Sequence, residues 1–141
     1  MRTLFTMLGL SIVLLGPKVQ ADDVTKDSVS VKEIDLKGVR LTPVRGGFGQ
    51  PKEIGSAEEL RRVFPDEDTQ ARIKKEVDFS RVKLLYFAWS GSGQDRVTSS
   101  IKGEDNKMEV SFTFQPGRTK DLRAHFRLFA IGKDIRWRVI R

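Results

Sequence analysis

The stretch "RVKLLYFAWSGSGQD", residues 81–95, decides the fold. Residues 83–89 are dense in large apolar side chains, which is typical of a strand buried on both faces. The run leads directly into Ser90-Gly91-Ser92-Gly93, and glycine admits the backbone conformations that a chain reversal needs. We therefore expect a central strand that ends in a glycine-rich loop.

The segments after this loop change polarity with a period of two residues. Residues 97–102 and 107–115 flank a turn-forming cluster at residues 103–106, and this arrangement predicts a hairpin. In its second arm every other residue from Met108 to Phe114 is apolar, so one face is expected to enter the core.

The C-terminal stretch "LRAHFRLFAIGKDIRWRVIR", residues 122–141, predicts a second hairpin around Gly132-Lys133-Asp134. Apolar residues share one side of each arm, and basic residues occupy the other side. We expect the hairpin to bury its apolar face and to present a cationic one. The basic residues are Arg123, His125, Arg127, Arg136 and Arg138.

Two short helices are predicted upstream of the central strand. Ser56 and Glu59 form a capping box, in which Ser56 accepts from the N–H of Glu59 and the Glu59 side chain returns a bond to the N–H of Ser56. Pro65 ends that helix. Residues 66–76, with acids early and basic residues late, predict a second helix.

The N-terminal part of the domain is predicted to be extended. Residues 29–36 alternate as in a half-buried strand, residues 39–44 form a second extended piece, and residues 45–51 are a loop rich in glycine and proline. The whole pattern predicts an α+β domain, an antiparallel sheet packed on one or two short helices, over residues 28–141.

The first residues are typical of a cleaved signal peptide over residues 1–21, followed by a flexible lead-in at residues 22–27. The apolar run at residues 4–15 is shorter than the ~20 residues that a membrane span needs. The chain has no cysteine, so neither a lipid anchor after cleavage nor disulfides are expected, which favours bacterial export to the periplasm or the medium. Without Arg2 and Lys18, 24 basic residues face 19 acids, a formal charge of +5.

Composition and spacing exclude several chemistries. One histidine and no cysteine cannot form a usual zinc or haem site, and the acids at residues 66–70 lack the glycine and glutamate of a calcium loop. Neither glycine-rich segment carries the lysine and hydroxyl of a phosphate-binding loop or the spacing of a nucleophile elbow. No metal or cofactor is expected. A Ser92–His125–Asp95 triad can be written, although any serine and aspartate could be combined with the single histidine, and it leaves a small serine hydrolase as an alternative.

The aromatic residues beside the two glycine-rich segments suggest a protein-binding surface, because aromatic side chains are favoured interface anchors. A noncatalytic module would bind an extracytoplasmic protein through these loops. The alternative is that either aromatic residue belongs to the core. The candidate partner-binding residues are Phe48, Trp89, Ser90, Gly91, Ser92, Gly93 and Gln94.

The cationic face of the predicted C-terminal hairpin suggests a second alternative. Fixed guanidinium groups bind phosphate, sulfate and carboxylate groups well, so an anionic polymer is a possible partner. A solvated sheet face is the simpler explanation. The candidate anion-binding residues are Arg123, Arg127, Arg136 and Arg138.

The order of elements over residues 77–131 resembles the C-terminal domain of PrcB-type protease-complex subunits. The resemblance lies in residues 77–80, the apolar strand, the glycine loop, the alternating hairpin and Pro116-Gly117. In that family the loop typically carries a threonine, two glycines and a tyrosine, whereas Gly91-Ser92-Gly93-Gln94 keeps the two glycines without the aromatic residue. The resemblance implies a small extracytoplasmic accessory or binding module.

Overall fold

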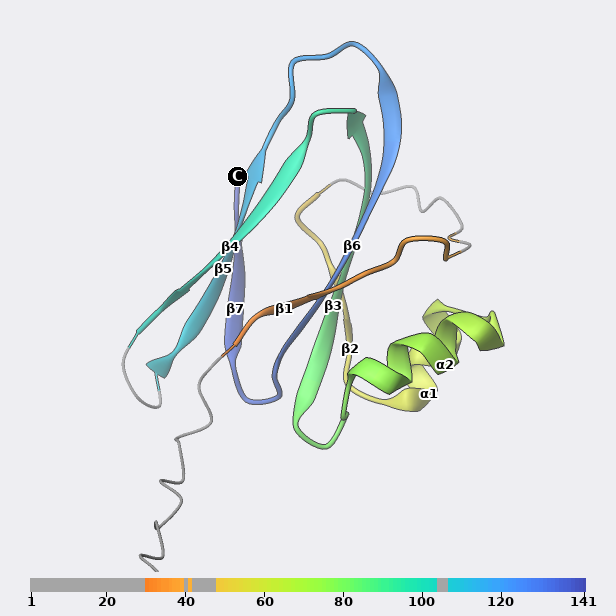
Figure 1. Ribbon diagram of the computed structural model, residues 1–141. Helices are drawn as coiled ribbons and strands as arrows, with labels where there is room; N and C mark the ends of the chain where they lie inside the picture. The colour runs from red at the N-terminus through yellow and green to blue at the C-terminus, as the bar shows by residue number, and fades with distance from the viewer. Residues whose placement is uncertain (1–29, 40, 42–47, 104–106) are drawn as a thin grey trace, which may run out of the picture.

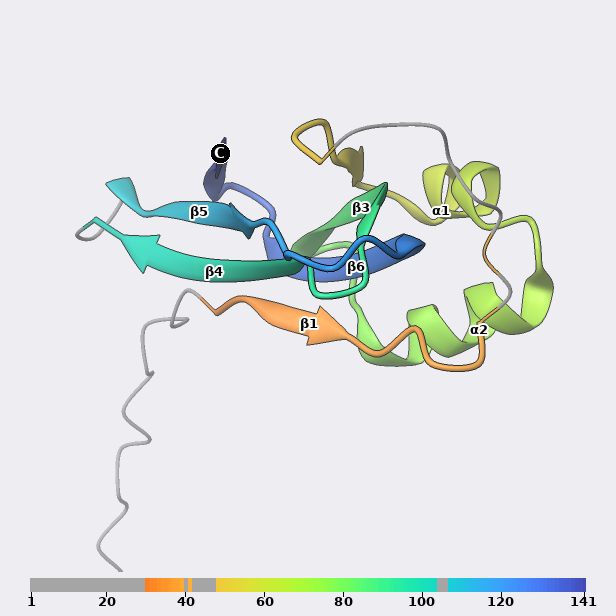
Figure 2. The ribbon, with the colours of Figure 1, turned by 90° about the horizontal axis from the view of Figure 1, so that it is seen from above.

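The computed structural model describes residues 30–39, 41, 48–103 and 107–141, arranged as seven strands and two helices. The predicted signal peptide, the lead-in, and most of the extended piece at residues 39–44 lie outside the described residues. The elements form three layers, with the helices on one side, a four-stranded sheet in the middle and a three-stranded sheet on the other side (Figures 1 and 2). The predicted α+β class is therefore confirmed.

The middle sheet is built on one long antiparallel pair. Strand β3 (Val82–Ser92) pairs with β6 (Leu122–Gly132) along the whole length of both strands. Short strands flank this ribbon, β1 (Lys32–Ile34) beside β6 and β2 (Lys52–Ile54) beside β3, which gives the order β1-β6-β3-β2. The flanking strands cover only the lower half of the ribbon as drawn in Figure 1.

Both helices begin where the sequence places a capping residue. Helix α1 (Ala57–Val63) starts after Ser56, which accepts from Glu59 N–H at 3.2 Å. The Glu59 carboxylate accepts from Gly55 N–H at 2.6 Å, so the predicted return bond to Ser56 is wrong by one residue. Helix α2 (Glu67–Glu76) starts after Asp66, which accepts from both the N–H and the hydroxyl of Thr69.

The helices cover one face of the middle sheet. Leu60 of α1, Phe64 at the C-cap of α1 and Ile73 of α2 are buried against the central strands. Their neighbours are even-numbered residues, including Leu84 and Tyr86. The ring of Phe64 meets that of Tyr86 edge-on at 5.0 Å. This apolar layer forms the first core.

The second core lies between the two sheets. The three-stranded sheet has the order β4-β5-β7, from β4 (Arg96–Lys102), β5 (Glu109–Gln115) and β7 (Arg136–Ile140). Its inward residues meet the odd-numbered residues of β3 and β6, so β3 is buried on both faces as predicted. The buried members of this core are Phe48, Leu85, Phe87, Trp89, Val110, Phe112, Phe129 and Ile131.

The predicted C-terminal hairpin is wrong. Strands β6 and β7 are joined by a tight turn at Gly132, but β6 pairs with β3 and β1, whereas β7 runs parallel to β5 in the other sheet. The C-terminal half of β6 has a strand on each edge, so no edge is left there for β7. The predicted hairpin of β4 and β5 is confirmed.

Burial raises the pKa of Tyr86, the only tyrosine of the chain, to about 12. The neutral phenol is therefore favoured in the folded state, and the contribution of Tyr86 to stability should be fully present below pH 10 and decrease between about pH 10 and 12. We expect absorbance at the phenolate wavelength to rise with a midpoint near 12 in the folded protein and near 10 in denaturant. Tyr86→Phe removes the absorbance step, and a folded-state midpoint near 10 would contradict the prediction.

Candidate functional site

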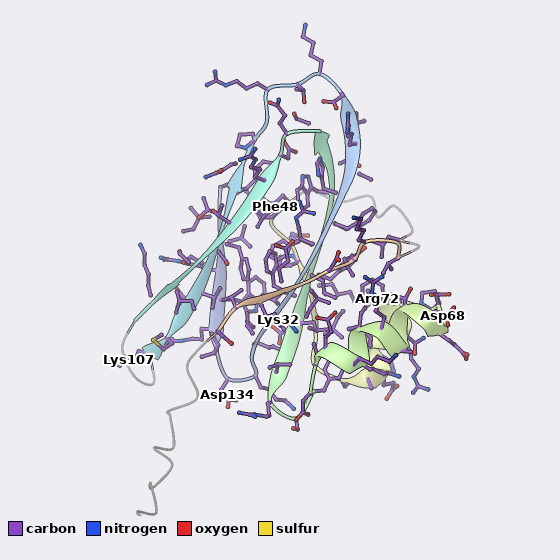
Figure 3. All side chains as sticks on the ribbon, in the orientation of Figure 1. Lys32, Phe48, Asp68, Arg72, Lys107 and Asp134 are labelled. Atoms are coloured by element: carbon purple, nitrogen blue, oxygen red, sulfur yellow. The ribbon has the colours of Figure 1, made fainter. Side chains whose placement is uncertain are left out.

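The structure places the two predicted aromatic anchors in the core. Phe48 is 8% exposed and Trp89 is 2% exposed. The Phe48 ring lies between the β3–β6 ribbon and the second sheet, stacked on Phe87 at 5.1 Å and on Phe114 at 4.8 Å (Figure 3). The expectation that Phe48 and Trp89 are surface anchors is therefore wrong, because both rings fill the space between the sheets.

The predicted glycine loop is shorter than expected. Ser90, Gly91 and Ser92 continue strand β3, and the chain reverses at Gly93 and Gln94. A Cβ atom on Gly91 would lie 1.9 Å from Asp95 Oδ2, so this glycine provides space for a neighbouring carboxylate. A side chain at position 91 would displace Asp95, so a Gly91 variant is a poor test of partner binding.

Asp95 is a buried carboxylate that holds this turn against the core. Its Oδ2 accepts from Trp89 Nε1 at 3.1 Å, and its Oδ1 accepts from Gly117 N–H at 2.7 Å. The two bonds join β3 to the loop between β5 and β6. Since buried polar groups need partners, Asp95 fixes both segments at once.

The outer side of the turn is fixed by a second set of bonds. Ser92 Oγ accepts from Thr119 N–H at 3.1 Å and lies 2.6 Å from Thr119 Oγ1. Asp121 accepts from Gly93 N–H at 3.1 Å. The Thr119 hydroxyl and the Gly93 N–H, together with the charge of Arg123, lower the pKa of Asp121 to about 2. The two loops at this end of the ribbon are thus interlocked.

The candidate serine triad does not have the geometry of a relay. His125 stacks on Trp89 at 4.8 Å, and its Nε2 lies 2.7 Å from the carbonyl oxygen of Ser92 rather than its hydroxyl. Because a carbonyl group only accepts, Nε2 must carry the hydrogen. The Asp95 carboxylate bonds Trp89 and Gly117. His125 is thus placed as a donor that fastens the end of β3.

The four candidate anion-binding arginines do not share one face. Arg123 and Arg127 lie on β6, whereas Arg136 and Arg138 lie on β7 in the other sheet. Three of them form ion pairs with carboxylates of the chain: Arg123 with Asp121 at 2.6 Å, Arg127 with Glu33 at 3.2 Å, and Arg138 with Glu109 at 2.9 Å. The prediction of a single cationic face is therefore wrong, because the arginines lie in two different sheets.

A concave surface lies along β6, and sequence reasoning missed it. A groove of about 710 Å³ separates residues 124–127 from the end of β1 and the segment that follows it, residues 33–37 with Val39 and Leu41. Above it Leu122 is 80% exposed and Ala124 is exposed, while Phe126 is half-buried. These three residues share the face that carries the helices further down the ribbon. The alternation of apolar and polar residues over 122–128 could have predicted this apolar strip. No neighbouring residue shows that the helices leave the strip uncovered.

Comparison of the chain with protein-family models, with curated proteins and with solved structures finds no significant match. Within the described ranges, no group of three or more His, Asp or Glu side chains is placed to hold a metal ion. The helices in the same ranges are too short or too polar to span a membrane.

The buried Asp95 should contribute strongly to stability. Asp95→Ala leaves the Trp89 indole and the Gly117 N–H without an acceptor, and we expect a loss of about 1–3 kcal/mol in the free energy of unfolding. Urea unfolding followed by tryptophan fluorescence measures it. Gln94→Ala, at the exposed neighbouring position, is the matched control, and equal midpoints for the two variants would contradict the role of Asp95.

The lowered pKa of Asp121 makes a second, pH-dependent prediction. A carboxyl whose folded pKa lies below its ordinary value of 3.8 stabilises the fold above about pH 4, and this contribution is lost as the pH falls towards 2. Wild type should therefore be more stable than Asp121→Asn at pH 6, and the difference should vanish near pH 2. A difference that does not depend on pH would show that Asp121 acts through its shape alone.

Proposed function

We propose that this chain is a noncatalytic, extracytoplasmic accessory module that binds a protein partner through the groove along β6. The observation that carries the proposal is the uncovered apolar strip of Leu122, Ala124 and Phe126 beside that groove. Elsewhere on the described surface, the large apolar side chains that are exposed, Ile101 and Ile140, are each only about two-fifths exposed. An exposed apolar strip next to a concavity is typical of a protein-binding surface.

The rigid end of the ribbon supports this proposal. Hydrogen bonds from Ser92, Asp95 and Asp121 join the β3–β4 turn to the loop before β6, so the strand that carries the apolar strip starts from a fixed support. A surface that is ordered before binding loses less conformational entropy when it binds. The predicted signal peptide and the resemblance of residues 77–131 to PrcB-type domains support an extracytoplasmic setting.

The interlocked polar groups support a binding role over the hydrolase alternative. Ser92 Oγ accepts from backbone N–H groups of Thr119 and Gln94, and His125 donates to a carbonyl oxygen. These two side chains thus pair with backbone groups and hold the end of the ribbon in place, which is a structural role.

Capture from the envelope fraction of the source organism tests the proposal. Tagged mature protein should retain at least one partner that Leu122→Asp loses, because a buried unpaired carboxylate would oppose apolar contact. Ile140→Asp places the same change on the outer face of β7 and should retain the partner. Capture of nothing by wild type, or an identical set by the two variants, would refute binding through this groove.

A further inference from the structure

We infer that the partner binds as an extended strand added to the open edge of β6 between Leu122 and Phe126. This inference rests on the proposed function and specifies how the groove is occupied. Figure 1 shows that the ribbon extends beyond β1 at this point. The argument depends on which backbone groups of β6 face that edge.

The direction of the backbone groups follows from the register. Lys133 N–H donates to Arg81 O at 2.9 Å, so these two residues form a hydrogen-bonded pair at the start of the β3–β6 ladder. In an antiparallel ladder hydrogen-bonded pairs alternate with non-bonded pairs. Along β6 the backbone N–H and C=O groups of the odd-numbered residues therefore bond to β3. The backbone N–H and C=O groups of the even-numbered residues point to the opposite edge.

That opposite edge is only partly used. Strand β1 pairs with β6 at residues 128–130 and leaves the sheet after Ile34. The backbone groups of Leu122, Ala124 and Phe126 thus face away from β3 with no strand of the described residues beside them. A hydrogen bond of Arg127 supports this direction, because its guanidinium donates at 3.1 Å to the carbonyl oxygen of Phe126, which points away from β3. Among the described residues, none bonds to the N–H groups of these three residues or to the carbonyl groups of Leu122 and Ala124, so these groups can pair with an added strand.

The side chains beside this edge define the chemistry of the added strand. On the helix-side face, Leu122, Ala124 and Phe126 present apolar surface to the neighbouring position. On the other face, Arg123 and Arg127 flank His125, and their ion pairs with Asp121 and Glu33 are solvent-exposed and therefore weak, so an acid of the added strand can exchange with these partners. Opposite charges are favourable cross-strand pairs, and like charges are unfavourable. The edge therefore fits a segment in which apolar and acidic residues alternate, and the formal +5 charge of the mature chain favours its approach.

A second copy of this chain fits the same edge less well. Antiparallel pairing of two β6 strands about Ala124 would place Arg123 of each copy opposite His125 of the other. We therefore assign the edge to a peptide segment, and self-association is an outcome that the test distinguishes.

The test uses a fluorescein-labelled ten-residue peptide of alternating valine and glutamate. Fluorescence anisotropy should show that it binds at least about tenfold more tightly than the matching valine–lysine peptide. Amide exchange measured by NMR should slow at Leu122, Ala124 and Phe126 when the peptide is bound. Equal affinity for the two peptides, or no protection at these amides, would overturn the inference.

A proline variant isolates the role of the backbone. Ala124→Pro removes an outward N–H that the sheet itself does not use, and proline is tolerated where the N–H of an edge faces solvent. The variant should fold and bind the valine–glutamate peptide at least about tenfold more weakly. Ala124→Thr keeps the N–H and should bind within about threefold of wild type. Equal binding by the proline variant would refute strand addition.

Two further results separate this inference from the proposed function. If envelope capture identifies a partner that Leu122→Asp loses but Ala124→Pro keeps, the groove binds protein and strand addition is wrong. If sedimentation shows a wild-type dimer that Ala124→Pro abolishes, the edge serves a second copy and the peptide assignment is overturned. Failure of capture with wild type removes the proposed function, whatever the peptide result.

Discussion

The pairing of β3 with β6 is the interaction on which the rest of the structure depends. Each strand has eleven residues, and alternate residues feed opposite cores. The row in which Tyr86 lies beside Leu128 faces the helices, and the next row, in which Leu85 lies beside Phe129, faces the second sheet. A change of register by one residue would exchange these two sets, so the pairing fixes both cores together.

Short strands cover the edges of this ribbon over part of its length and leave the rest open. Both flanking strands have the sequence Lys-Glu-Ile, and each places its isoleucine in the core under the helices. Each glutamate meets a cation on the other face, Glu33 with Arg127 and Glu53 with Lys83. Charged residues of this kind protect short edge strands from further pairing. The protection ends where the flanking strands end, and the surface proposed for binding begins there.

Local features of the chain were predictable and distant ones were not. The helix starts at Ser56 and Asp66 and the double burial of β3 follow from neighbouring residues, and the structure has them close to the predicted positions. The partner of β7 depends on which edges are already occupied, and no local turn signal carries that information. The same limit explains the candidate site. Trp89 is buried between the sheets, and Gly91 leaves room for Asp95 to accept from its indole N–H. The groove exists because β1 is shorter than β6.

The nesting of the strands has a consequence for the order of folding. The β4–β5 hairpin lies in the segment that connects β3 to β6. Its formation therefore shortens the loop that must be closed before β3 and β6 can pair. Strand β7 needs β5 in place and supplies Trp137 and Val139 to the second core. That core therefore stays incomplete until β7 has paired with β5, and until then one side of its aromatic cluster is open to solvent.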